Sequence, residues 1–286
     1  MKKLFNLRRK PLSFILRLAV LLSAAVTSFI ILFIVGYILI KGIPNLTPSL
    51  FSWKYNSDNV SLTPALVNTI IMTFLSLLIA APLGIFSAVY LVEYAKRGNR
   101  LVSVVRMAAE TLSGIPSIVY GLFGMLFFVV ALKWGLSLLS GSFTLAIMIL
   151  PLIMRTTEEA LLSVPDSYRE GSFGLGAGKL RTVFSVVLPS AVPGILAGVI
   201  LAIGRVVGET AALIFTAGTV AKIPENLLSS TRTLSVHMYN LSSEGLYINQ
   251  TYATAVVLLV LVICINALSG HMAKKVTGAR TGERNG

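Results

Sequence analysis

Long uncharged apolar runs, separated by short charged stretches, are the dominant pattern of the chain. Runs of 23, 34, 22 and 21 residues without a charge cover Leu18–Ile40, Asn59–Val92, Thr111–Leu132 and Trp134–Met154. Each run is long enough to cross a membrane, because a hydrocarbon core of about 30 Å needs about 20 helical residues. The pattern predicts an all-α integral membrane bundle of about six transmembrane helices, at residues 16–40, 64–92, 112–132, 141–162, 191–217 and 250–272.

The amount and placement of charge exclude two other classes of protein. Charged residues make up 12% of the 286, about half the usual share of a soluble domain. The net charge of +13 comes from basic residues that flank the spans, without the interleaved aromatics of a nucleic-acid interface, so we expect no nucleic-acid partner. The single Cys264 excludes a disulfide within one chain, and His237 and His271 are too isolated for a metal site.

The connecting segments sort into a basic set and a less basic set. One set carries 18 Lys plus Arg and comprises residues 1–17, 93–110, 155–181 and 271–286. The other carries five and comprises residues 41–63, 133–140 and 219–249. Since the more basic side normally stays in the cytoplasm, we expect both termini there. Segment 219–249 is either a solvated connector or a contact for a partner outside the membrane.

Three parts follow from this topology. Residues 1–60 are expected to hold a cytoplasmic tail, the first transmembrane helix and an outer loop. Residues 61–272 form the core, including a cytoplasmic loop at 158–190, and residues 273–286 form a second cytoplasmic tail. The first apolar segment is too long for a typical signal peptide, so we interpret it as a retained anchor.

The cytoplasmic loop predicts a helix, a glycine turn and a second helix. Pro165 and Asp166 favour a helix start. Gly174, Gly176 and Gly178 end that helix, and a second is expected from Lys179 to Leu188-Pro189. The glycines do not form a nucleotide-binding Walker loop, which needs Gly-Lys followed by Ser or Thr after a strand. Any ATP hydrolysis is therefore expected in a partner chain.

Two charged residues, Arg205 and Glu209, lie inside the fifth predicted span. Because they are four residues apart, they are expected on one helical face about 6 Å apart, where each partly neutralises the other. They form either a structural clamp or a pair in which Arg205 binds an anion and Glu209 orients it, because the guanidinium suits tetrahedral oxyanions. Gly204 and Gly208 beside them would allow a close approach of neighbouring helices.

Arg155 and the Gly114–Pro116 stretch are two further candidates. Arg155 lies nearer the cytoplasm than Arg205 and is either a second cation along an anion path or a residue that reaches the headgroups or pairs with Glu158 or Glu159. Gly114–Pro116 is expected to break or kink the third span. The kink serves either packing alone or the exposure of backbone amides to an anion.

The stretch from Glu170 to Pro189 resembles the "EAA" loop of bacterial ABC importer permeases. Glu170, Gly176, Val186, Leu188 and Pro189 stand at the matching spacing, while Gly171 and Ser172 replace the two alanines of the pattern. The resemblance implies a coupling helix that docks in a groove of an ATPase subunit. The residues that it assigns to this coupling are Ser167, Tyr168, Arg169, Glu170, Gly171, Ser172, Phe173, Gly174 and Gly176.

Three further stretches resemble phosphate-importer permeases, specifically the PstA-type subunit: TLSGIPSIVYGLF, RTTEEAL and GRVVGETAAL. The resemblance implies a non-enzymatic transport subunit whose substrate path includes Arg205, Glu209 and Arg155. It also implies a bacterial inner-membrane location with a PstC-type permease, an ATPase dimer that holds ATP and Mg, and an extracytoplasmic phosphate-binding protein as partners. This chain itself is expected to hold no cofactor. The alternatives are a permease for phosphonate, sulfate or molybdate, and an ATP-independent secondary transporter.

Overall fold

The structure is a computed structural model that describes residues 11–96 and 98–282. In this part of the chain every regular element is helical, so the predicted all-α class is confirmed. The basic residues expected in the first tail, Lys2, Lys3, Arg8, Arg9 and Lys10, lie outside the described residues, as does Arg284. The helices are α1 (Pro11–Gly42), α2 (Thr63–Val89), α3 (Arg100–Ser113), α4 (Ser117–Gly124), α5 (Leu138–Leu162), α6 (Asp166–Gly174), α7 (Lys179–Thr182), α8 (Leu188–Gly208), α9 (Ala211–Thr216), α10 (Leu234–Glu244) and α11 (Ile248–Gly282).

Short 3-10 and π-helical segments extend or link these helices. Two 3-10 segments, η2 (Ile43–Asn45) and η3 (Pro48–Phe51), follow α1. Three π-helical segments, η4 (Tyr90–Tyr94), η5 (Met125–Ala131) and η6 (Val183–Val187), extend α2 and α4 and join α7 to α8.

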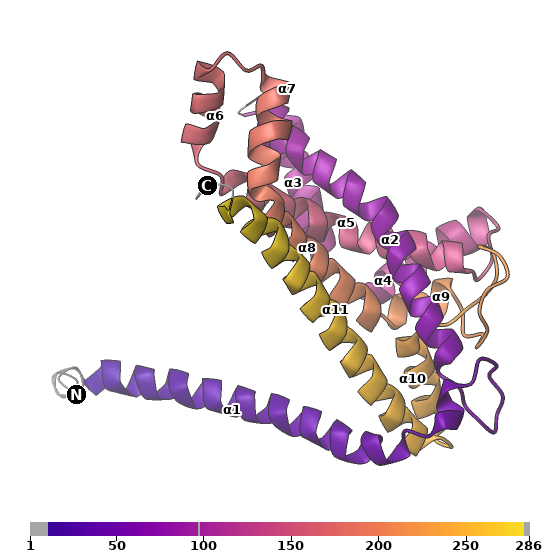
Figure 1. Cartoon of the computed structure of the whole chain (residues 1–286). Coiled ribbons are helices and arrows are strands. Elements are labelled where there is room, and N and C mark those ends of the chain that lie inside the picture. Colours follow the sequence, from indigo (N-terminus) through magenta and orange to yellow (C-terminus); the bar gives the residue numbers. More distant parts are fainter. Residues whose placement is uncertain (1–10, 97, 283–286) are drawn as a thin grey trace.

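Among the described residues, five helices are long and apolar enough to cross a membrane. A sixth span is counted if the bent pair formed by α3 with α4 and η5 is taken as one. Figure 1 shows α6 at one end of the elongated bundle, close to the end of α11, and α10 at the opposite end. We call these the α6 end and the α10 end.

Helices α2, α5 and α8 form the centre of the bundle. Fully buried side chains from all three meet there, among them Met72, Ile149 and Ala202. Small residues set the spacing: a Cβ on Gly84 would lie 2.9 Å from the Ile153 side chain. Burial of apolar side chains in this layer positions the helices that carry the predicted site.

Helix α1 stands apart from the bundle except at its end (Figure 1). Its apolar side chains are largely exposed, with Leu32 at 70% and Ile40 at 74%. It contacts α11 through Gly42, which lies against the Tyr252 backbone, and through an edge-to-face contact of Tyr37 with Tyr252. A surface of this kind needs lipid or another protein chain to cover it.

The third span, expected at 112–132 with a break or kink at Gly114–Pro116, starts earlier than expected. Helix α3 already begins at Arg100, and α3 and α4 meet at an angle of 104° at Gly114–Pro116. The predicted break is therefore confirmed, although the amphipathic α3 before it was not expected. The Tyr120 hydroxyl donates to the Leu112 carbonyl (2.8 Å), which also accepts from the Ile115 N–H, and so ties α4 to the end of α3 across the bend.

The expected helix stop at Leu188-Pro189 is wrong. Helix continues from Lys179 to Gly208, a stretch of 30 residues. Pro189 lies just after the π-helical η6, and this local distortion interrupts the regular backbone ladder that a proline would otherwise break. The second loop helix and the fifth span are thus one continuous helix.

A solvated connector at 219–249 is also wrong for its central part. Residues 231–237 are buried, and they pass between α2 and the end of α8. The Thr69 hydroxyl of α2 accepts from the Leu234 N–H (2.8 Å), and the Asn68 amide donates to the Arg232 carbonyl (3.2 Å). This segment therefore closes the α10 end of the bundle.

Candidate functional site

Helix α6, the predicted coupling helix, projects from the bundle with every residue exposed or half-buried (Figure 1). Tyr168 and Phe173 are 46% and 47% exposed, and Leu175 just after the helix is 91% exposed. Gly176 has a φ of +79°, a left-handed conformation that favours glycine, so the turn after α6 depends on this residue. An exposed helix with uncovered aromatic side chains is suited to docking against another protein.

Arg169 fastens α6 to the bundle, because its guanidinium is directed inward. It donates to the Glu93 Oε1 from Nε (3.1 Å) and Nη2 (2.7 Å). It also donates to the carbonyls of Leu161 (3.0 Å) and Val164 (2.8 Å) and pairs with Asp166 (3.1 Å). Of the residues assigned to ATPase coupling, Arg169 therefore lies on the bundle side of α6.

Ser172 makes a second inward contact. Its hydroxyl lies 2.9 Å from that of Thr182 on α7, which ties the two arms of the loop together. The remaining residues assigned to coupling are exposed, and they are Ser167, Tyr168, Glu170, Gly171, Phe173, Gly174 and Gly176. The structure thus separates an outward surface of α6 from an inward anchoring side.

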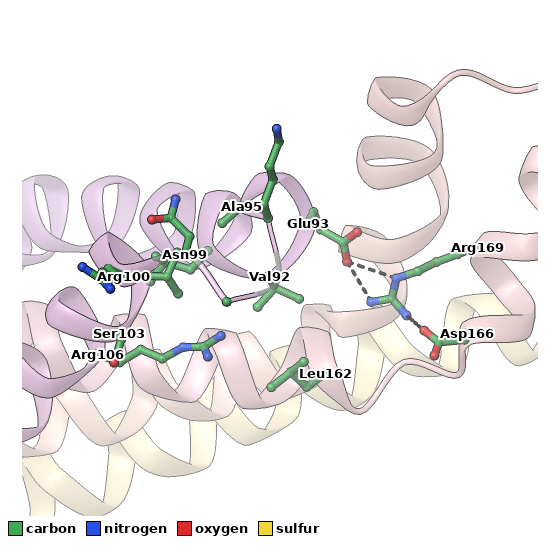
Figure 2. A pocket seen from close by; sticks show the side chains of 14 residues that line it. Val92, Glu93, Ala95, Asn99, Arg100, Ser103, Arg106, Leu162, Asp166 and Arg169 are labelled. Carbon is green, nitrogen blue, oxygen red and sulfur yellow. Dashed lines mark hydrogen bonds and ion pairs between the residues drawn. The ribbon is translucent and has the colours of Figure 1, made fainter.

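A cavity of about 840 Å³ lies beside this anchor, between η4, the start of α3 and the end of α5. Figure 2 shows Arg100, Asn99 and Arg106 on one side of it and the Glu93–Arg169–Asp166 chain on the other. Arg106 forms an ion pair with Glu158 of α5 (2.6 Å) that joins α3 to the bundle. The α6 end is therefore held by two separate ion pairs between different elements.

Arg205 lies in the last turn of α8 and is half-buried. Within the described residues, its guanidinium forms no hydrogen bond and no ion pair. A Cβ on Gly204 or Gly208 would likewise meet nothing of the described chain within 4 Å, so the expected close helix approach does not occur there within this chain. This face of α8 is open toward whatever lies beside the chain.

The predicted Arg205–Glu209 pair on one helical face is wrong. Helix α8 ends at Gly208, and Glu209 has an extended backbone (φ −72°, ψ 132°). Its buried carboxylate accepts from the Ala212 N–H (3.0 Å) and so caps the short α9. The Ser235 hydroxyl of α10 donates to the Val207 carbonyl (2.5 Å) at the same break. A broken helix within a bundle requires such local partners for its free backbone groups.

Arg155 is exposed on α5 and pairs with Glu159 (3.4 Å), one of the two partners considered from the sequence. Its level relative to Arg205 follows from two contacts between antiparallel helices, Gly198 with Thr156 and Gly194 with Ala160. When α5 and α8 are aligned by these two contacts, Arg155 lies about 9 Å nearer the α6 end than Arg205, measured along the helix axes. The two arginines are therefore staggered along the bundle and are not neighbours.

Sequence reasoning missed two buried charged residues. Glu93 pairs with Arg169, but its position at the end of a long apolar run gives no signal for a partner 76 residues away. Arg232, counted as an outer-loop cation, is only 5% exposed and lies over the Tyr55 ring (4.7 Å). Burial lowers the pKa of His237 to about 3, helped by the nearby Arg232 charge.

Comparison with known families identifies the class of this bundle. Residues 80–278 match the family described as the inner membrane component of binding-protein-dependent transport systems. The chain belongs to this permease family. The match covers α2 from Ala80 onward, the bent third span, α5, the α6 loop and α8 to α11, so it includes both parts of the candidate site.

Relatives that match most of the chain are named as transport permease proteins. The probable ABC transporter permease protein YqgI of Bacillus subtilis is 36% identical, covering 79% of this chain and 81% of that protein. The phosphate transport system permease proteins PstA of Haemophilus influenzae and PstC of Mesorhizobium japonicum are each 31% identical, covering 86% and 81% of this chain and 88% and 78% of those proteins.

Solved permease structures share the fold at lower identity. A chain of the MetNI methionine ABC transporter superposes with a TM-score of 0.60 at 22% identity, covering 75% of this chain and 94% of that chain. A chain of a bacterial ABC transporter for import of alginate gives 0.64 at 15% identity, covering 97% and 100%. These likenesses establish the permease architecture and carry no information on the substrate.

Proposed function

We propose that the chain is a permease subunit of an ATP-driven importer of inorganic phosphate. The observation that carries this is Arg205, an unpaired guanidinium at an open face beside a helix break, in a chain whose relatives include the phosphate permeases PstA and PstC. A planar cation fits a tetrahedral oxyanion through paired hydrogen bonds. Arg155, about 9 Å nearer the α6 end, is a second cation for an anion moving inward.

The partners follow from the two exposed parts of the chain. A second, PstC-type permease chain covers the open face of α8 and completes the path, while lipid covers the rest. An ATPase dimer binds the outward surface of α6 and holds ATP and Mg, since this chain supplies no Walker loop. A phosphate-binding protein delivers substrate at the α10 end. The α6 end and both termini face the cytoplasm of a bacterium whose inner membrane holds the complex.

Alternating access accounts for the mechanism. Closure of the ATPase dimer pushes α6, the bundle opens toward the α10 end, and hydrolysis returns it to the inward-open state. The chain forms no covalent bond with its substrate. The energy of ATP is therefore used to shift the relative stability of two states of the bundle.

Two alternatives have less support. Phosphonate, sulfate and molybdate are also tetrahedral anions, but two of the relatives described above are phosphate transport system permeases. A secondary transporter works without ATP and would give the projecting α6 no role. Transporters of that class usually contain internal repeats with broken helices in corresponding positions.

Uptake of labelled phosphate by vesicles that contain the intact complex tests the proposal. Arg205→Ala is expected to abolish uptake while the complex still assembles, because the anion loses its cationic contact. Arg100→Ala, which removes an exposed arginine at the start of α3, is the matched control and should retain uptake. Near-normal uptake by Arg205→Ala would leave Arg205 as a structural clamp outside the anion path, and equal competition by sulfate and molybdate would refute the phosphate assignment.

A further inference from the structure

Helix α6 is connected to three transmembrane helices, but only two of these connections are covalent. Residues 163–165 join it to α5, and residues 175–178 with α7 and η6 join it to α8. Helix α2 with its extension η4 is more than 70 residues away in sequence. The backbones of α6 and η4 make few close approaches, so side chains bridge the gap between them.

The Arg169–Glu93 ion pair is the main bridge. Figure 2 shows the Arg169 guanidinium between Glu93 and Asp166 at the edge of the cavity. The side chains of Arg169 and Glu93 are only 15% and 8% exposed, so water screens their attraction less than that of a surface pair. Two guanidinium nitrogens engage the same carboxylate oxygen, at 2.7 and 3.1 Å.

The same guanidinium also engages the end of α5. It donates to the carbonyls of Leu161 and Val164, which lie in the last turn of α5 and just beyond it. One side chain of α6 therefore contacts both α5 and η4. A second, weaker bridge lies nearby, where the Lys179 ammonium is 5.2 Å from the centre of the Tyr94 ring.

These polar contacts determine where α6 lies relative to the bundle. Because every residue of α6 is exposed or half-buried, apolar burial contributes little to holding it. Glu93 lies in a π-helical turn, a type of distortion found frequently at functional sites. Helix α2 in turn packs into the bundle core through Met72 and Gly84.

We propose that the Arg169–Glu93 pair makes α2 follow α6 during the transport cycle. This inference rests on the proposed function, and it makes Arg169 and Glu93 positioning residues and not docking contacts. With the pair intact, a push on α6 displaces α2 together with α5 and α8. Without it, α6 still binds the ATPase and moves α5 and α8, but only apolar packing against α5 draws α2 along, so the η4 end of α2 follows α6 less closely.

Coupling of hydrolysis to transport in the whole reconstituted complex tests the pair. Glu93→Gln keeps the shape of the side chain but removes its charge, and the ratio of anion imported to ATP hydrolysed is expected to fall about fivefold or more while the ATPase stays bound. Glu158→Gln is the matched control, because it breaks the Arg106 ion pair at the same end without touching α6. Arg169→Lys keeps the positive charge, so its ratio of anion imported to ATP hydrolysed is expected to fall less than that of Glu93→Gln. An equal loss in Glu93→Gln and Glu158→Gln would overturn the proposal.

A distance measurement tests the movement without reference to the substrate. Spin labels on Leu175→Cys, just after α6 and outside the residues assigned to coupling, and on the exposed Leu78→Cys of α2 report the separation of α6 and α2 in a Cys264→Ser background. The separation is expected to stay constant on ATP addition with Glu93 present and to change in Glu93→Gln. Constant distances in both would overturn the inference, whereas the wrong transported anion would overturn only the phosphate assignment.

Discussion

Arg205 carries its charge inside a membrane-spanning helix, where an ionised side chain is energetically unfavourable. An ionised side chain inside the membrane costs several kcal/mol unless a partner or a wet path compensates it. Its position in the last turn of α8 offsets part of this cost, because the carbonyl end of a helix favours cations. Since the described chain offers it no ion pair, an anion, a neighbouring subunit or a water-filled path has to supply the rest.

Glu209 has two separable roles, a cap and a charge. Glu209→Gln keeps the oxygen that accepts the Ala212 N–H, so the complex should assemble normally while phosphate uptake falls with the lost charge. Glu209→Ala removes the cap as well and should destabilise the chain by about 1 kcal/mol. Uptake assays and melting temperatures of both variants distinguish the two roles. Normal transport by Glu209→Gln would show that Glu209 acts only as a helix cap and that its charge is not needed for transport.

His237 should make the α10 end sensitive to acid. Its folded pKa of about 3 lies below its ordinary 6.5, so the unfolded chain takes up a proton that the folded chain refuses. Stability is therefore complete above pH 6.5 and declines as the pH falls toward 3, by ~2 kcal/mol at pH 5.

Melting temperatures of the purified protein between pH 7.5 and 5 measure this effect. His237→Phe keeps a ring beside Tyr55 but cannot titrate, so its melting temperature should depend less on pH. An unchanged pH dependence in this variant would assign the acid sensitivity to other groups.

At the scale of elements, α6 was predictable because its signals are local. Pro165, Asp166 and the following glycines bound the helix where the structure has it. The Gly114–Pro116 break was predictable for the same reason. The continuation through Pro189 was not, because it depends on a π-helical turn that no local residue pattern announced.

The candidate site was only half predictable, since its charges depend on tertiary contacts. Spacing alone placed Glu209 beside Arg205, but the helix break moves it to the start of α9. Arg169 and Glu93 are far apart in the chain, and no repeating pattern in the sequence predicts that they form an ion pair.

The outward surface of α6 should carry the ATPase contact. Glu170→Lys reverses an exposed charge in the middle of the helix, so co-purification of the ATPase subunit and transport should both fall sharply. Glu225→Lys makes the same charge change on an exposed residue of segment 219–249 and should leave ATPase binding intact. Normal ATPase retention by Glu170→Lys would move the docking surface elsewhere.

At the scale of the whole molecule, the arrangement of ends supports one orientation. Helix α6 and the end of α11 lie at the same end of the bundle (Figure 1). Among the described residues, Arg100, Arg106, Arg169 and Lys179 lie at that end, and the charge rule assigns the more basic segments of the sequence to the cytoplasm.

Reporter fusions measure this orientation directly. An enzyme that is active only in the cytoplasm should work when fused after Gly286, and one that requires the outer compartment should work when inserted at the exposed Glu225. The reverse pattern of activities would invert the topology and remove α6 from the reach of a cytoplasmic ATPase.

The uninterrupted helix from Lys179 to Gly208 has a mechanical consequence. Thirty residues at a rise of 1.5 Å give a rod about 45 Å long, with the α6 loop at one tip and Arg205 close to the other. A tilt of about 10° around the loop tip would swing the far tip by about 8 Å, more than one helical turn. Leverage of this kind would let a modest rocking of the loop reposition the guanidinium across the width of an anion pathway.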